Sequence, residues 1–195
     1  MFKSAWIFCL LFIRLILLDA HAQISIPELK YTSSDSSLVK DTSLQKLRKE
    51  NKIVVLFRTC STWDYSVQFT VVTYGEDSKW KLYFGNGRGA DNLEPVDFPE
   101  DSIIKIWRAF IDNDILTIRD EKDLHRDCDW YVFDAHEYYI TILTKTAYKK
   151  LHYYAPEFFE AHCSSIPEAQ KLIKWGSQVG RILKDNKPRS KLSLQ

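Results

Sequence analysis

The sequence predicts an α+β protein, an antiparallel sheet of about six strands with two main helices packed on one face. Three observations predict this class. A tight β-hairpin is expected between Glu137 and Tyr154, strand-like runs alternate with turns between residues 53 and 84, and two later segments carry one apolar stripe each. Alternating strands and one-sided helices fit a sheet with helices on one face.

The hairpin is the most specific of these patterns, because only Lys145-Thr146 separates two runs rich in β-branched and aromatic residues. A two-residue turn defines the register. One face should then pair Ile142 with Lys149, Ile140 with Leu151 and Tyr138 with Tyr153, and the other should pair Leu143 with Tyr148, Thr141 with Lys150 and Tyr139 with His152. We expect the helices on the first face, because Lys150 would be costly to bury, whereas Lys149 near the turn can reach water along its apolar stem.

Residues 1–22 have the pattern of a secretory signal: Lys3, an apolar run from Ala5 to Leu18, and Ala20-His21-Ala22 as a cleavage site. Arg14 and Asp19 make the segment too short and too polar for a membrane span. We therefore expect a soluble exported protein, periplasmic or secreted, that is cleaved near Ala22.

The charge balance excludes some partners. The whole chain has a formal net charge of +1, and cleavage would leave it neutral. Without an excess of basic residues, neither nucleic acid nor an anionic membrane is an expected partner. The length and the aromatic content fit a single domain over residues 41–184, with a flexible leader over residues 23–40 and a flexible tail over residues 185–195.

Cys60, Cys128 and Cys163 would remain after cleavage. An odd number in an oxidising compartment indicates one disulfide and one free thiol. Cys128 and Cys163 lie equally far from the hairpin turn on its two extensions, which favours their pairing, although Asp134 and Pro156 interrupt both arms.

The first half of the domain should contain a short helix and a meander. The helix is expected over Asp41 to Glu50, and the strands over Ile53 to Cys60, Tyr65 to Tyr74 and Lys79 to Phe84. In the middle strand Phe69 and Val71 alternate with polar residues, and we expect Trp80, Leu82 and Phe84 to continue this face. Gly85 to Pro95 is expected to be an exposed loop, because it lacks the residues of a phosphate-binding loop.

The two main helices are expected over Asp97 to Asp112 and Pro167 to Lys184. Capping boxes are predicted for both, from the pairs Asp97 with Glu100 and Ser165 with Glu168. Gly176 and Gly180 indicate close approach of the second helix to the sheet, since each costs about 1 kcal/mol relative to Ala. Ile115 to Ile118 is expected to form either a short strand or a connection from helix to sheet, and a further strand is considered over Trp130 to Phe133.

Ligand-type residues gather in one segment, from His125 to Glu137. His125, Asp134 and His136 could assemble a metal site, but no recognised ligand spacing is present, and no cofactor is expected. Cys163 with its neighbours His162 and Glu160 has the residue types of a thiol hydrolase, but adjacent side chains usually diverge.

The aromatic residues are divided between core and surface in our interpretation. Trp63, Trp80, Trp107, Trp130 and Trp175 are expected in the core. Tyr139, Tyr148 and His152 on the uncovered hairpin face, with Tyr154, Phe158 and Phe159 beside them, are expected to form a surface for a protein or carbohydrate partner.

The C-terminal third resembles a group of uncharacterised exported bacterial proteins with a Tyr-rich hairpin. The resemblance lies in D-A-H-E-Y-Y-I-T-I, in A-Y-K-K-L-H-Y-Y-A-P and in the Pro-Glu helix start that follows. Ala135 stands where those proteins usually have a glycine. They have no known activity, so the resemblance implies only compartment and fold class.

Two functional hypotheses follow. The first is a non-catalytic exported binding or interaction module, and the alternative is a hydrolase-type enzyme or metal-binding protein that uses the His125 to Glu137 region. A flat Tyr-rich face would favour binding, and a pocket with convergent polar groups would favour catalysis. The sequence determines neither the identity of a partner nor the oligomeric state.

Overall fold

A computed structural model describes residues 26–32, 41–61, 68–86, 92–133 and 135–186 of the chain. The expected signal over residues 1–22, the last nine residues, Trp63 and Asp134 lie outside the described residues. Along the chain the elements are α2 (Thr42–Glu50), β1 (Asn51–Ser61), β2 (Gln68–Gly75), β3 (Trp80–Asn86), β4 (Leu93–Val96), α3 (Glu100–Asp112), the 3-10 helix η3 (Glu121–Asp123), β5 (His136–Thr144), β6 (Tyr148–Tyr154), α4 (Pro156–His162) and α5 (Pro167–Asp185).

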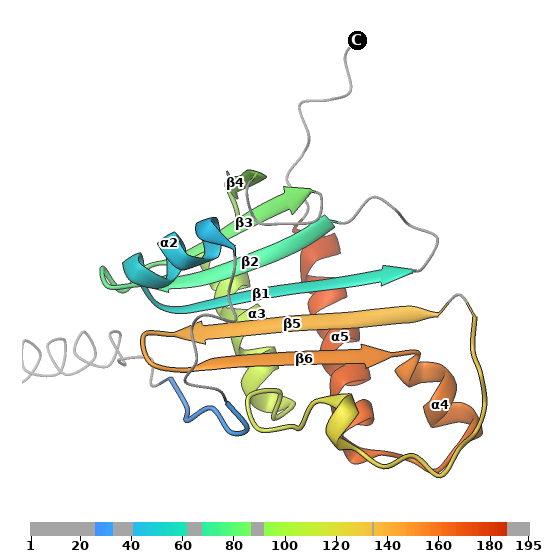
Figure 1. The fold of residues 1–195 in the computed structure, drawn as a ribbon. Helices are drawn as coiled ribbons and strands as arrows, with labels where there is room; N and C mark the ends of the chain where they lie inside the picture. Colours follow the sequence, from blue (N-terminus) through green and yellow to red (C-terminus); the bar gives the residue numbers. More distant parts are fainter. Residues whose placement is uncertain (1–25, 33–40, 62–67, 87–91, 134, 187–195) are drawn as a thin grey trace, which may run out of the picture.

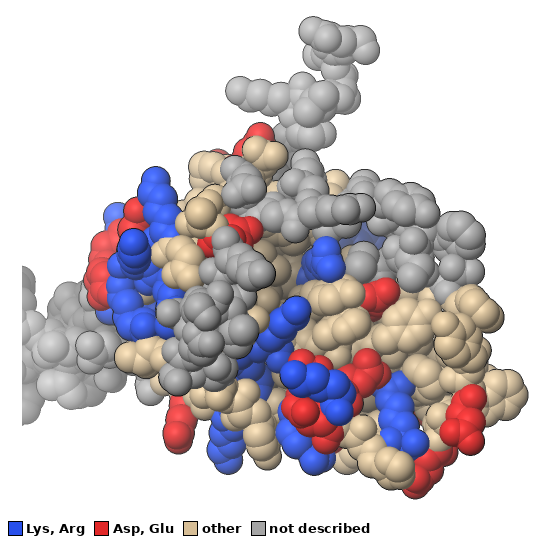
Figure 2. All heavy atoms as spheres, viewed as in Figure 1, with Lys and Arg blue, Asp and Glu red and all other residues tan. Residues whose placement is uncertain are grey.

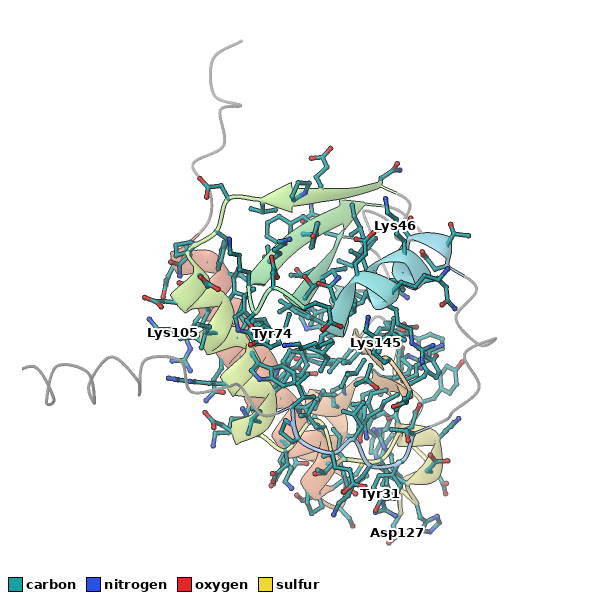
Figure 3. All side chains as sticks on the ribbon, turned by 90° about the vertical axis from the view of Figure 1, so that its left-hand side faces the viewer. Tyr31, Lys46, Tyr74, Lys105, Asp127 and Lys145 are labelled. Carbon is teal, nitrogen blue, oxygen red and sulfur yellow. A yellow bond between two sulfur atoms is a disulfide. The ribbon has the colours of Figure 1, made fainter. Side chains whose placement is uncertain are left out.

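The fold class is the one that the sequence predicts. Six antiparallel strands form one sheet in the order β4-β3-β2-β1-β5-β6 (Figure 1). Helices α3 and α5 cover one face, which we call the main face, and α2 lies against the opposite, second face (Figure 3). None of the helices in the described ranges has the length and apolar character that crossing a bilayer requires.

The β5–β6 hairpin has the predicted register, from Leu143 opposite Tyr148 to Tyr138 opposite Tyr153. Its Ile140 and Leu151 side lies in the main core beneath the helices, as expected. The prediction for Lys149 was wrong. This side chain is buried, and its Nζ donates to the carbonyl oxygens of Lys30 at 2.8 Å and Ile118 at 2.6 Å.

The meander also forms, but the predicted continuity of its apolar face was wrong. Val71 pairs with Tyr83, and Val72 pairs with Leu82. Phe69 and Val71 therefore pack on the second face with α2, while Leu82 joins the main core. The middle strand is buried on both faces from Phe69 to Gly75, so strict alternation was a poor guide to its orientation.

The helices form where expected, with α5 starting at the predicted Pro167, but the capping of the two main helices differs from the prediction. Asp41 caps α2 by accepting from Ser43 N and Leu44 N, each at 3.0 Å. Neither predicted capping box forms: α3 begins at Glu100, α5 begins at Pro167, and neither has a side-chain cap. Glu100 instead accepts from the backbone nitrogen of Trp80 at 3.2 Å and so ties α3 to β3.

Three further segments differ from the sequence-based expectations. β4 overlaps the end of the predicted loop and pairs with β3. Ile115 to Ile118 and Trp130 to Phe133 form no strand, because neither finds a partner in the sheet. Residues 26–32, which belong to the expected leader, lie against the domain: Ile26 and Leu29 pack on the main core.

Candidate functional site

The second face of the sheet is covered by α2 at one end only. Leu44 and Leu47 of α2 pack on Val54, Val71 and Leu143. Further along β5 and β6, towards α4, the strands carry Tyr139 and His152 instead (Figure 1). Figure 2 shows this face, with uncharged atoms running from the sheet towards α4 between groups of charged atoms.

Three side chains from three adjacent strands form a stack on this uncovered part. The register places Tyr139 of β5 between Arg58 of β1 and His152 of β6. The Tyr139 and His152 rings are parallel within 8°, with centroids 4.2 Å apart, and Arg58 Cζ lies 4.0 Å from the tyrosine ring centroid. A guanidinium over an aromatic face is attracted by the ring electrons, so the three groups stabilise one another.

Glu137 holds the stack in place. Its Oε2 accepts from the Tyr139 hydroxyl and lies 3.0 Å from His152 Nε2. Burial, followed by the hydrogen bond to Glu137, raises the pKa of Tyr139 to about 12. The phenol therefore stays protonated at neutral pH and acts as a hydrogen-bond donor, and the carboxylate that could serve as a base is already engaged by two partners.

The third predicted binding residue, Tyr148, does not join this stack. It lies four residues before His152 on the same face of β6, about 13 Å away at the usual rise of a strand. Its side chain packs against the cluster beneath α2. The structure thus brings together Tyr139 and His152, and it assigns Tyr148 to the packing of α2.

The proposed metal ligands are not gathered. His125 Nε2 pairs with Asp127 Oδ1 at 2.9 Å on an exposed turn, whereas His136 opens β5 opposite Ser61. Within the described residues no group of three His, Cys, Asp or Glu side chains is arranged to hold a metal ion. Asp134, the third candidate, lies outside those residues.

The predicted disulfide between Cys128 and Cys163 is present, with 5.8 Å between the two Cα atoms. It joins the segment before β5 to the end of α4 (Figure 1). The thiol hydrolase considered for Cys163 therefore lacks its nucleophile, because a disulfide sulfur is not a thiolate.

The disulfide precedes a run of exposed aromatic side chains, which we call the aromatic loop, residues 128–133. Trp130, Tyr131 and Phe133 are 64, 81 and 76 % exposed. The ring centroids of Tyr131 and Phe133 are 4.8 Å apart, and Trp130 meets Phe158 of α4 at 6.5 Å. The prediction that Trp130 lies in the core was wrong, whereas Trp80, Trp107 and Trp175 are buried as expected.

The aromatic loop is tied to the edge strand β6. The Tyr154 hydroxyl donates to the Val132 carbonyl at 2.8 Å, and the Tyr154 backbone nitrogen donates to Glu121 Oε2 at 2.7 Å. Glu121 also pairs with Arg126, whose guanidinium lies 4.0 Å from the ring centroid of Phe159. Burial raises the pKa of Glu121, against the opposing effects of the Tyr154 amide and Arg126.

These anchors explain why sequence reasoning missed the loop. Four apolar residues between aspartates are typical of a short strand, but here the edge of β6 is occupied by η3 and its flanking residues. The signal available in the sequence was the combination of Cys128 with flanking Asp127 and Asp129, which is more typical of an exposed loop than of a strand.

Comparisons of the chain with protein family models, with curated proteins and with solved structures found no match.

Proposed function

We propose that this protein is exported and acts as a non-catalytic binding module for another protein, with the aromatic loop as its main contact. The observation that carries the proposal is the exposure of Trp130, Tyr131 and Phe133 on a loop that a disulfide and Tyr154 hold in place. Large aromatic side chains supply much of the binding energy of protein interfaces. A loop held in its bound shape also loses less conformational entropy on binding.

Export is supported by three features. The Cys128–Cys163 bond is of a kind that persists in oxidising compartments. Residues 1–22 have the composition of a secretory signal, and the C-terminal hairpin resembles that of exported bacterial proteins.

The side chains around the loop favour binding over catalysis. Two carboxylates near the stack and the loop are already paired: Glu137 with Tyr139 and His152, and Glu121 with Arg126. A catalytic group needs a free coordination or proton-transfer partner within hydrogen-bond reach of a substrate. The paired groups instead hold the surface rigid around the exposed rings.

The orientation of the rings favours a protein over a flat sugar. Tyr131 and Phe133 meet at 65°, and Trp130 meets Phe158 at 66°, so the rings do not form one plane. Rings that project at different angles suit separate pockets on a partner, as hot-spot side chains do. The neighbouring Arg126 and the exposed Asp127 and Asp129 would form a polar rim.

A photo-crosslinking experiment tests the proposal. A photoreactive phenylalanine analogue at Tyr131 should crosslink one discrete protein in the envelope fraction of the source organism, and the same analogue at Ile111 on α3 should not. Ile111 is an exposed apolar residue on a different element, the helix α3, and serves as the matched control. The Trp130→Ser/Phe133→Ser variant should compete poorly for that protein. Equal competition by this variant, or binding to a glycan array instead of a protein, would contradict the proposal.

A further inference from the structure

A cavity of about 870 Å³ lies between the C-terminal half of α5 and the β1, β2, β3 and β4 strands. This volume is in the range of small-molecule sites. Most of the lining belongs to the main face, but Arg58 and Phe69, which the second face also uses, border the cavity at the end of the sheet. None of the lining residues belongs to the aromatic loop. Its walls are mainly apolar, with contributions from Phe57, Phe84, Trp175, Val179, Gly180 and Leu183.

The packing of α5 does not explain why residue 180 is a glycine. Gly176, one turn earlier, lacks a side chain because a Cβ there would lie 2.6 Å from Cε1 of Tyr138. A Cβ at Gly180 would meet no atom within 4 Å, so the predicted close approach to the sheet holds for Gly176 and was wrong for Gly180. Glycine in a helix interior costs about 1 kcal/mol relative to alanine. Its effect at position 180 is to leave the wall of the cavity open.

The cavity wall also contains a hydroxyl group. Thr70 of β2 borders the cavity, between its sheet partners Phe57 and Phe84, which border it too. Its hydroxyl can donate a hydrogen bond to an acceptor oxygen on a ligand. The indole nitrogen of Trp175 is fully buried and is not counted among the groups that a ligand would reach.

The charged residues of the lining favour an uncharged ligand. Lys184 is accompanied by Glu94 and Asp97, and the Arg58 guanidinium is stacked on Tyr139 at the other face. An anionic head would meet the two carboxylates, and a cationic head would meet Lys184. We propose that this cavity binds a small, uncharged, mainly apolar molecule that carries one hydrogen-bond acceptor.

The probe that tests this is prodan, an uncharged naphthalene ketone whose emission shifts to the blue in apolar surroundings. The full-length mature protein should bind it saturably at one site. Anilinonaphthalene sulfonate has a similar ring system with a negative charge, and it should bind at least about tenfold more weakly, because an unpaired charge in an apolar site is costly. Equal binding of the two probes would overturn the assignment of an uncharged ligand.

Gly180→Leu should abolish prodan binding by filling the cavity, without loss of thermal stability, since leucine is the better helix former. Ser177→Leu, the same residue introduced on the exposed side of α5, is the matched control and should bind prodan as the wild type does. Thr70→Val keeps the shape of the side chain and removes the hydroxyl, so it should weaken binding by about tenfold. This variant gives a second result should Gly180→Leu fold poorly. Absence of saturable prodan binding, or unchanged binding in both the Gly180→Leu and Thr70→Val variants, would overturn the proposal.

Discussion

Lys149 keeps its ammonium group inside the main core, where the residue is 1 % exposed. Two backbone carbonyls accept its hydrogen bonds, and the ring centroid of Tyr31 lies 5.5 Å from its Nζ. Burial lowers the pKa of Lys149 to about 8, with a smaller opposing effect of Asp120. The hydrogen bonds of this side chain thus link β6 to the segments before α2 and after α3. Burying the ammonium group in the core costs free energy.

This burial predicts a pH dependence of stability. Below pH 8 the ammonium is protonated in both states, whereas between about pH 8 and pH 10 the unfolded chain binds this proton and the folded chain does not. Stability should therefore rise with pH in this window, by up to about 1.4 kcal/mol per pH unit from this group. Urea unfolding at several pH values should show that Lys149→Met removes this rise.

Lys150→Met is the control, because the neighbouring lysine is exposed and should leave the slope unchanged. The rise ends near pH 10, because the lysine of the unfolded chain also loses its proton there. Buried tyrosines such as Tyr153 and Tyr138 then add an opposite effect, because burial raises their pKa values. Above that pH the folded chain retains protons that the unfolded chain loses, and stability should fall. Identical slopes in the wild type and Lys149→Met would contradict the prediction.

Truncating Tyr153 and Tyr139 compares how much each face of the hairpin contributes to the free energy of unfolding. Tyr153 is fully buried and donates to the Arg119 carbonyl at 2.6 Å, so Tyr153→Ala should cost about 3–5 kcal/mol. Tyr139 is half-buried in its stack, and Tyr139→Ala should cost only about 1–2 kcal/mol. Equilibrium unfolding in urea would measure both, and equal losses would show that the second face is packed as tightly as the core.

At the scale of elements, α5 offers a matched pair of glycines. Gly176→Ala should destabilise the protein by about 1–3 kcal/mol, because the new methyl group would overlap the Tyr138 ring. Gly180→Ala should stabilise it by about 0.5–1 kcal/mol, because the position is open and alanine is the better helix former. Thermal melts of the two variants should shift in opposite directions. A shift in the same direction would mean that α5 does not lie against β5 at this distance.

The disulfide also connects two elements, because it joins the aromatic loop to the end of α4 across a sequence separation of 35 residues. Closing a loop of that length in the unfolded chain contributes roughly 3–4 kcal/mol. Cys128→Ser/Cys163→Ser should lower the melting temperature accordingly, and it should also weaken partner capture by freeing the loop. Cys60→Ser takes no part in this bond and is the control. A double variant as stable as the control would contradict this role.

At the scale of the whole molecule, the sheet separates two surfaces of different character. The main face contains the apolar core and the cavity beside α5, and the second face contains the stack and leads to the aromatic loop. Each surface can change without the other, because the strands between them are buried from both sides at β1 and β2. Prodan binding and partner crosslinking should therefore be separable by mutation.

The proposed export also concerns the whole molecule. When the full chain is produced in its source organism, the mature protein should begin at Gln23 and contain one disulfide and one free thiol. Intact-mass measurement before and after thiol alkylation would determine both. Recovery of the chain with residues 1–22 still attached would contradict the predicted cleavage.

Local patterns in the sequence determined the elements and one long-range bond. A two-residue turn leaves a hairpin one register, so every predicted pair from Leu143–Tyr148 to Tyr138–Tyr153 forms. Apolar residues at helical spacing predicted which faces of α3 and α5 are buried. The same register placed Tyr139 beside His152. It also left Cys128 and Cys163 at equal distances from the turn, which predicted their disulfide.

Only the tertiary structure decided which surface each element meets. Trp130 and Trp175 are equally apolar in the sequence, yet one is 64 % exposed and the other is fully buried, because η3 occupies the sheet edge and α5 lies across the main face. Lys149 is buried because carbonyls from residues 30 and 118, distant in sequence, surround its ammonium. Burial depends on contacts between segments far apart in the chain, which local residue patterns do not contain.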